Sequence, residues 1–144
     1  MDHELFAVKL CQLEEQYRDM RSKIYLMQQD DHEAIKQELK KMEEAYDKTM
    51  QLLRENTRGC RSPAVKALNE AQIVYDSKIK EIMQKDMPHY IRGEDRQEAK
   101  AEGRALYAEY SIDFAIQAVQ SALMAVLSAL DEQMNLEEWR NEDE

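Results

Sequence analysis

The sequence is poor in the residues that break helices and in cysteine. Its 144 residues include three Gly, two Pro and two Cys. Scarce Gly and Pro leave few tight turns, which argues against sheets of short strands and favours a few long helices. Two cysteines are too few for a disulfide framework, and a chain of this length with 43% hydrophobic residues can form a core without one. We therefore expect an all-α protein.

Motifs that carry catalysis are missing as well. The sequence has no glycine-rich phosphate loop and no Gly-x-Ser-x-Gly elbow. It also has no Glu-x-x-His pair of the kind that binds two iron ions in helical bundles. These absences favour a protein that is not an enzyme and that binds no cofactor.

Targeting signals are not apparent. The first residues, Met-Asp-His-Glu, lack the positive region and apolar run of a signal peptide. The most apolar stretch, 112–130, is interrupted by Asp113, Gln117, Gln120 and Ser128, which a membrane span would seldom carry. We expect a cytoplasmic protein that does not bind a membrane.

Charge is acidic and uneven. The net charge is −10, and residues 94–144 hold four Lys or Arg against thirteen Asp or Glu. Such a surface repels phosphate backbones, so nucleic acid is not expected as a partner. A basic or helical protein partner is compatible with it.

An apolar ladder with alternating steps of three and four residues runs through the first sixty residues. This spacing keeps one seam of a helix facing a partner helix. It predicts two helices, 2–28 and 31–57, folded into a coiled-coil hairpin. The ladder residues are Phe6, Leu10, Leu13, Tyr17, Met20, Ile24 and Met27, then Ile35, Leu39, Met42, Tyr46, Thr49 or Met50, and Leu53.

Local signals place the helix ends. Asp30 and Glu33 have the form of a capping box for the second helix, and Gly59 supplies a left-handed stop after it. Ser62-Pro63 is a strong start for a third helix, 63–87, which we expect to end at Met87 because Pro88 follows. A fourth helix over 94–135 precedes an acidic tail, 136–144. Together, these signals predict a single domain, 1–144, folded as an antiparallel four-helix bundle.

The third helix has a predicted apolar seam with one polar interruption, Gln72. Gln72 is a candidate partner for the hydroxyl of a seam tyrosine (Tyr17, Tyr46 or Tyr75), the alternative being a polar group that sets the register of the helix. The seam residues are Val65, Leu68, Tyr75, Ile79 and Ile82.

The fourth helix is apolar on most sides from Leu106 onward, with only a narrow polar stripe. Small residues at 115, 118, 122, 125 and 129, all alanine, would permit close approach of another helix. This excess of apolar surface indicates a central helix or a homodimer interface. We favour a dimer through the α-helical face formed by Ala115, Val119, Ala122, Leu123 and Val126.

The two cysteines have different expected roles. Cys60 lies between Gly59 and Arg61, next to Arg58 and just before a helix N-terminus, where positive charge and the helix dipole favour a thiolate. Cys60 is therefore a candidate reactive thiol, the alternative being an incidental loop cysteine. A disulfide to Cys11 is not expected, since the predicted hairpin separates the two; we expect Cys11 to be buried or half-buried.

Two weaker candidates for binding sites remain. His32, His89 and Asp31 would meet at one end of the predicted bundle, where they could hold a divalent metal, although helix capping explains the carboxylates equally well. Asp113 and Gln117, one turn apart, are the first groups to consider for a ligand site. The preferred function is an adaptor, chaperone-like or regulatory protein; the alternatives are a ligand- or metal-binding bundle with enzymatic activity and an acidic chaperone or inhibitor.

Overall fold

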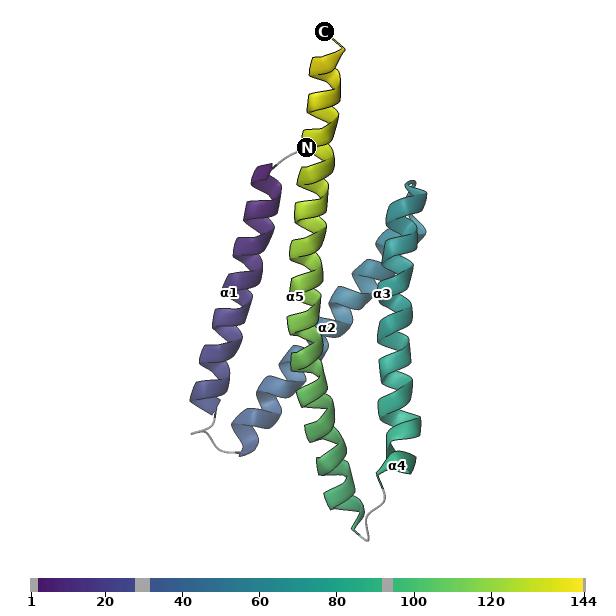
Figure 1. The fold of residues 1–144 in the computed structure, drawn as a ribbon. Helices are drawn as coiled ribbons and strands as arrows, with labels where there is room; N and C mark the ends of the chain where they lie inside the picture. Colours follow the sequence, from purple (N-terminus) through teal and green to yellow (C-terminus); the bar gives the residue numbers. More distant parts are fainter. Residues whose placement is uncertain (1–2, 28–31, 92–94, 144) are drawn as a thin grey trace. The chain divides into compact units, whose positions relative to one another are not determined.

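Almost all of the chain that the structure describes is helical. The computed structural model describes residues 3–27, 32–91 and 95–143, and these residues contain no β-strand. They form four long helices, α1 (His3–Met27), α2 (His32–Arg58), α3 (Pro63–Glu81) and α5 (Arg96–Glu142) (Figure 1). A π-helical turn, η1 (Ile82–Asp86), and a short helix, α4 (Met87–Tyr90), follow α3 directly. The predicted all-α class is confirmed, whereas the antiparallel bundle stays a prediction.

Contacts divide the chain into two units. The first, here called the α2–α3 unit, is Ser22–Gly103; the second, the α5 unit, combines Met1–Arg21 with Arg104–Glu144. The α2–α3 unit holds α2, α3, η1 and α4, and the α5 unit holds most of α1 and of α5. The prediction of a single domain over 1–144 is not tested by this division.

The connection between α2 and α3 confirms one end signal and overturns another. Ser62 is extended (φ −86°, ψ 116°), and its Oγ accepts a hydrogen bond of 3.3 Å from the backbone N–H of Val65, with Pro63 as the first helical residue. This is the predicted N-cap. The predicted left-handed stop at Gly59 is wrong, since no described glycine has a positive φ. The Cys60 N–H instead bonds the Thr57 carbonyl at 3.3 Å, a tight turn that needs no glycine.

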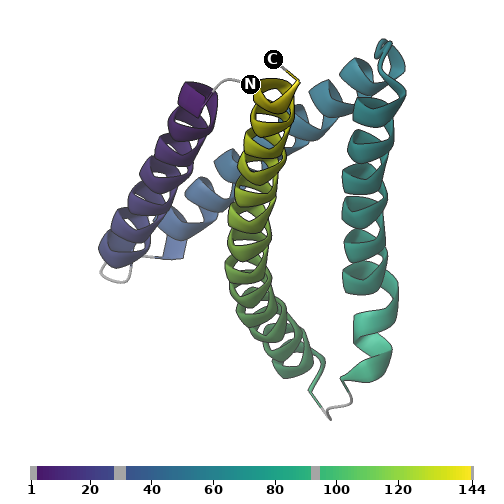
Figure 2. The ribbon, with the colours of Figure 1, turned by 45° about the horizontal axis from the view of Figure 1, so that its top comes forward.

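Helices α2 and α3 meet at the 59–62 connection and diverge away from it (Figures 1 and 2). The face that α3 buries contains Asn69, Ile73, Asp76 and Ile79, of which Asp76 is the most buried. Val65, Leu68 and Tyr75 of the predicted seam are exposed, so most of that seam was placed on the wrong face. The prediction followed apolar residues alone, while the contact is organised around a carboxylate.

Pro88 does not end the third helix where the sequence predicts. The chain stays helical through Tyr90 and becomes extended at Ile91 (φ −100°, ψ 106°), so the predicted end at Met87 is wrong. Proline has no N–H to donate and disrupts the usual pairing to the fourth residue before it. The Met87 N–H bonds the carbonyl of Ile82, five residues back, which widens this turn into η1 and lets the helix pass the proline.

Helix α5 extends further than predicted at its C-terminal end. Asp95 caps its start, because its Oδ1 accepts a hydrogen bond of 2.8 Å from the Gln97 N–H. The helix then runs for 47 residues, about 70 Å, to Glu142. Residues 136–142 are therefore helical, so the predicted helix end at residue 135 is wrong and the helix continues through most of the acidic tail. The acidic residues between 136 and 142 are exposed to water and still form regular helix, because the backbone hydrogen bonds of a helix do not require buried side chains.

Gly103, at the boundary of the α2–α3 unit, is buried where the first turns of α5 meet α4. A Cβ at this position would lie 3.1 Å from Met87 Cγ and 3.2 Å from Ile91 Cδ1. These distances are shorter than ordinary van der Waals contacts, so the lack of a side chain at Gly103 permits the close approach of α5 to Met87 and Ile91.

Most of the described ladder residues in α1 and α2 are exposed, whereas Phe6, Leu10 and Leu53 are half-buried. Leu13, Tyr17, Met20 and Ile24 of α1 are exposed. Lys23 of α1 forms an ion pair of 3.1 Å with Glu38 of α2. The predicted capping box falls partly outside the described residues, because Asp30 is not among them. The coiled-coil hairpin thus stays a prediction.

Candidate functional site

The best-defined cluster of polar side chains is centred on Asp76 of α3. Asp76 is only 6% exposed. Its Oδ1 accepts a hydrogen bond of 2.7 Å from the hydroxyl of Tyr46 on α2. The cluster therefore joins α2 and α3 by a directed contact between side chains thirty residues apart in the sequence.

Two cations complete the Asp76 cluster. Nζ of Lys80, one turn further along α3, lies 3.2 Å from Oδ2, and Nη2 of Arg54 on α2 lies 3.8 Å from it. Lys80 is also 6.0 Å from the ring centre of Tyr46, within the range of a cation–π interaction. Oδ2 receives no hydrogen bond of standard geometry from the described residues, so the two ion pairs hold it by charge.

These neighbours decide the charge state of Asp76. Burial raises the pKa of its carboxyl, but the Tyr46 hydrogen bond, Lys80 and the charge of Arg54 lower it by more, and the pKa lies below its ordinary value of 3.8. A carboxylate with a lowered pKa, hydrogen-bonded by Tyr46 and paired with Lys80 and Arg54, is a poor proton acceptor in catalysis. The cluster is suited instead to fixing the register of α2 on α3.

The Asp76 cluster was not predicted from the sequence. The sequence offers Gln72 as a partner for the hydroxyl of a seam tyrosine, but Gln72 is exposed. The Tyr46 hydroxyl bonds Asp76 instead, one helical turn after Gln72. The available signal was the spacing of Asn69, Ile73 and Asp76, which steps by four and three residues like an apolar seam.

Both cysteines are free thiols. Cys60 is half-buried, with Sγ 3.5 Å from the carbonyl oxygen of Ser62. Its proposed reactivity stays a prediction. Cys11 is exposed, so the expectation that it is buried or half-buried is wrong. It lies on α1, where most described side chains are exposed.

The candidate ligand residues are not gathered into a site. His32 begins α2 and His89 lies in α4, and both are exposed; Asp31 falls outside the described residues. Within 3–27, 32–91 and 95–143, no group of three His, Cys, Asp or Glu side chains is placed to hold a metal ion. Asp113 and Gln117 are exposed on α5.

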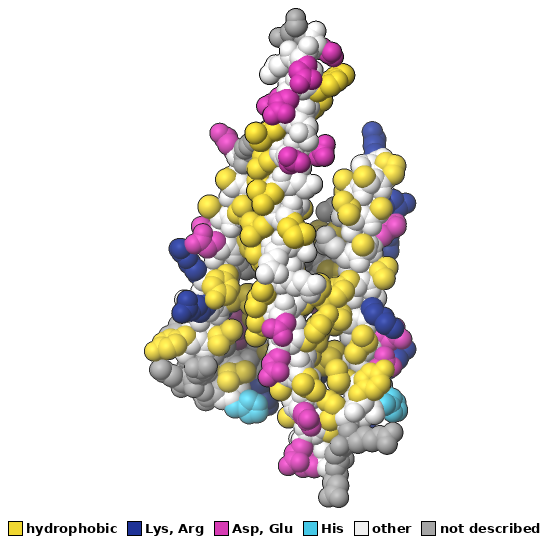
Figure 3. Space-filling model, viewed as in Figure 1, with side chains coloured by type: hydrophobic (Ala, Val, Ile, Leu, Met, Phe, Trp, Pro, Cys, Tyr) yellow, Lys and Arg dark blue, Asp and Glu magenta, His cyan; other side chains and the backbone are white. Residues whose placement is uncertain are grey.

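The predicted self-association face lies in the middle of α5. Val119 is 37% exposed and Leu123 45% exposed, Ala115 and Ala122 are exposed, and Val126 is half-buried. Figure 3 shows hydrophobic side chains at the surface along α5, with acidic side chains toward its ends. One turn before this face, the rings of Tyr110 and Phe114 stack with centroids 6.0 Å apart. The five residues that the sequence predicts for self-association thus form one continuous apolar surface on a single helix.

The same helix has a composition that a membrane span can have. Among the described helices, α5 is the one that is long and apolar enough to cross a membrane, and none of its most apolar window is buried. This criterion uses length and composition only, and the core helix of a water-soluble protein meets it too. No family model, curated protein or solved structure matches the chain.

Proposed function

We propose that this is a small cytoplasmic, non-enzymatic helical protein that acts through protein–protein contacts and self-associates as a homodimer through α5. Its role would be that of an adaptor, a chaperone-like protein or a regulator. The observation that carries the proposal is the exposed apolar face of α5 around Val119 and Leu123. Large contiguous apolar patches on a protein surface mark sites of association.

The balance of buried and exposed apolar surface supports association. Met50 is the one hydrophobic side chain classed as buried among the described residues, although 43% of the sequence is hydrophobic. Burial of apolar surface is the main favourable term in folding and in association. Contact with a further apolar surface therefore offers this protein a gain in stability.

The proposal includes the finer architecture expected from the sequence. The four long helices would pack as an antiparallel bundle, with α1 and α2 as a coiled-coil hairpin. The heptad ladders of both helices and the ion pair between Lys23 and Glu38 support this arrangement.

The test is to place a charge on the α5 face. We expect Val119→Glu to convert a dimer into a monomer in sedimentation velocity, with helix content by circular dichroism retained, because the carboxylate would be buried in the interface. Met124→Glu is the matched control, since Met124 lies on the polar stripe of the same helix and is 68% exposed. A wild-type monomer, or a Val119→Glu variant that stays dimeric, would contradict the proposal.

The alternative functions predict different results for the wild-type and Val119→Glu proteins. Unfolding of the Val119→Glu variant would make α5 an internal helix of the bundle. If wild-type protein floats with lipid vesicles, the apolar face of α5 binds a membrane surface and not a second protein chain. Extra mass retained in native mass spectrometry would favour the alternative of a ligand- or metal-binding bundle. Capture of a basic partner that is lost at high salt would favour the acidic chaperone or inhibitor.

A further inference from the structure

Small residues on α5 follow a strict heptad spacing. Ala115, Ala118, Ala122, Ala125 and Ala129 step by three, four, three and four residues, and the first four are exposed. Glu132, Leu136 and Trp139 continue the same spacing, and Arg104, Ala108 and Ser111 precede it; Ser111 and Ala129 are half-buried. This is the a and d pattern of a two-helix coiled coil, with alanine in place of the usual large residues. Small side chains at these positions let two helix backbones come close.

The flanks of this stripe carry one apolar row. Ile112, Val119 and Val126 repeat every seven residues, next to the d positions. Such flanking residues lie beside the contact of two close helices and cover it from water. The stripe and its flank together form the surface to be covered, and this surface includes four of the five residues of the proposed self-association face.

The ends of the helix carry charges that are complementary to each other. Near the N-terminal end, Glu98 and Lys100 lie in the flanking positions of the heptad, and Arg140 and Glu142 lie in the corresponding positions near the C-terminal end. All four side chains are exposed, and none forms an ion pair with another residue in the described part of the chain.

We propose that the second copy packs its α5 antiparallel on this stripe, with the two-fold axis at the level of Gln120. This inference rests on the proposed self-association. Ala118 then lies opposite Ala122 of the partner subunit, Glu98 lies across from Arg140 of the partner subunit, and Lys100 lies across from Glu142 of the partner subunit. Each ion pair occurs twice because of the symmetry.

The charge pattern selects this register among antiparallel ones. A shift of one heptad in one direction sets Glu98 against Gln133 and Lys100 against Asn135, which loses both ion pairs. A shift in the other direction sets Arg140 against Ala105 and Glu142 against Tyr107, with the same loss. Both shifts keep alanine-rich contacts, so charge is what separates the registers.

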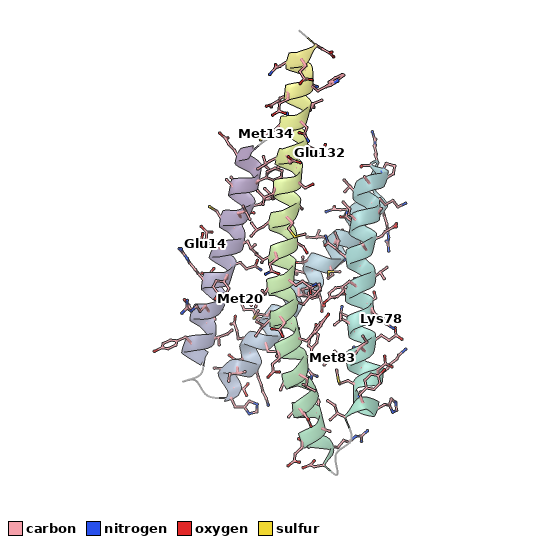
Figure 4. All side chains as sticks on the ribbon, viewed as in Figure 1. Glu14, Met20, Lys78, Met83, Glu132 and Met134 are labelled. Carbon is pink, nitrogen blue, oxygen red and sulfur yellow. The ribbon has the colours of Figure 1, made fainter. Side chains whose placement is uncertain are left out.

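A parallel pair is disfavoured by two residues on the stripe itself. Arg104 and Glu132 occupy heptad d positions, and in a parallel dimer each would face its own copy, which places like charges together. In the antiparallel pair, Arg104 lies opposite Leu136 and Glu132 opposite Ala108. Glu132 extends from the C-terminal half of α5, as does Met134 (Figure 4). Antiparallel helices also oppose their dipoles favourably.

Disulfide trapping tests the orientation. In a background with Cys11→Ser and Cys60→Ser, we expect Ser121→Cys to form a disulfide-linked dimer on mild oxidation, because residue 121 meets its own copy next to the axis. Ala108→Cys is the matched control. Its two copies would be about 36 Å apart in the antiparallel pair but adjacent in a parallel one, and a disulfide needs Cα atoms within about 7 Å.

Charge exchange tests the register. We expect Lys100→Glu to raise the dissociation constant of the dimer roughly fivefold, because it replaces an attraction by a repulsion at two symmetric places. Lys100→Glu combined with Glu142→Lys should restore the wild-type value at low salt. A failure of the double variant to recover would overturn the register.

The outcomes separate this inference from the proposed function. A wild-type dimer in which Ala108→Cys cross-links and Ser121→Cys does not is parallel, which overturns only the inference. A dimer in which neither variant cross-links uses another surface, which overturns both the inference and the assignment of the self-association to α5. A wild-type monomer in sedimentation velocity overturns the self-association and the inference together.

Discussion

The contact between α2 and α3 and the exposed face of α5 are organised by opposite kinds of residues. Asp76, Tyr46, Lys80 and Arg54 connect α2 and α3 through directed polar contacts, with Met50 as the buried hydrophobic residue of α2. The α5 face is apolar over most of its length and presents alanine, valine and leucine to solvent. A buried charge must find its partners within the chain, because an unpaired one is costly. Apolar surface can be covered by any apolar partner, so it suits association.

The largest expected effect in this comparison comes from removing the buried carboxylate. We expect Asp76→Ala to lower the free energy of unfolding by about 2–4 kcal/mol, because it leaves Tyr46 without its acceptor and two cations without their counter-charge. Lys80 and Arg54 are partly exposed and regain some hydration, which keeps the loss below that for a fully buried pair. Urea denaturation measures the change. Glu70→Ala, which removes an exposed acid from the same helix, is the control and should be near neutral. An equal loss of unfolding free energy in both variants would show that the Asp76 cluster contributes no more to stability than an exposed acid does.

A smaller effect is expected from removing the hydrogen bond alone. Tyr46→Phe keeps the ring and its contact with Lys80 but deletes the donor to Asp76, and we expect a loss of about 1–2 kcal/mol. Denaturation of Tyr17→Phe, at an exposed position on α1, provides the reference and should change little. If Tyr46→Phe is as stable as the wild type, the register of α2 on α3 depends on the ion pairs and not on the phenol.

The smallest effect in this series depends on pH. Because the pKa of Asp76 is lower in the folded protein than its ordinary value, the carboxylate contributes stability above about pH 4 and loses it as pH falls through the folded pKa. The difference in unfolding free energy between wild type and Asp76→Asn should therefore narrow as the pH is lowered from 6 toward 3. A difference that stays constant over this range would contradict the assigned cause of the shift.

Helix positions were predictable from local chemistry. The spacing of apolar residues, the Ser62-Pro63 start and the scarcity of glycine and proline identified the long helices within a few residues at most ends. The wrongly predicted helix ends have local causes that the spacing of apolar residues does not reveal. Pro88 is accommodated by a π-helical turn, Gly59 is not left-handed, and the acidic residues after 135 continue α5.

The sequence by itself determined where the helices of this protein form, because capping, proline geometry and heptad spacing act over a few neighbouring residues. It also determined the alanine stripe and the complementary charges of α5, which are properties of a single helix. Only the tertiary structure decided that α3 turns Asp76 rather than Tyr75 toward α2. The reason is that the stability of a buried carboxylate depends on a hydroxyl and two cations, and Tyr46 and Arg54 reach it only when α2 and α3 pack together.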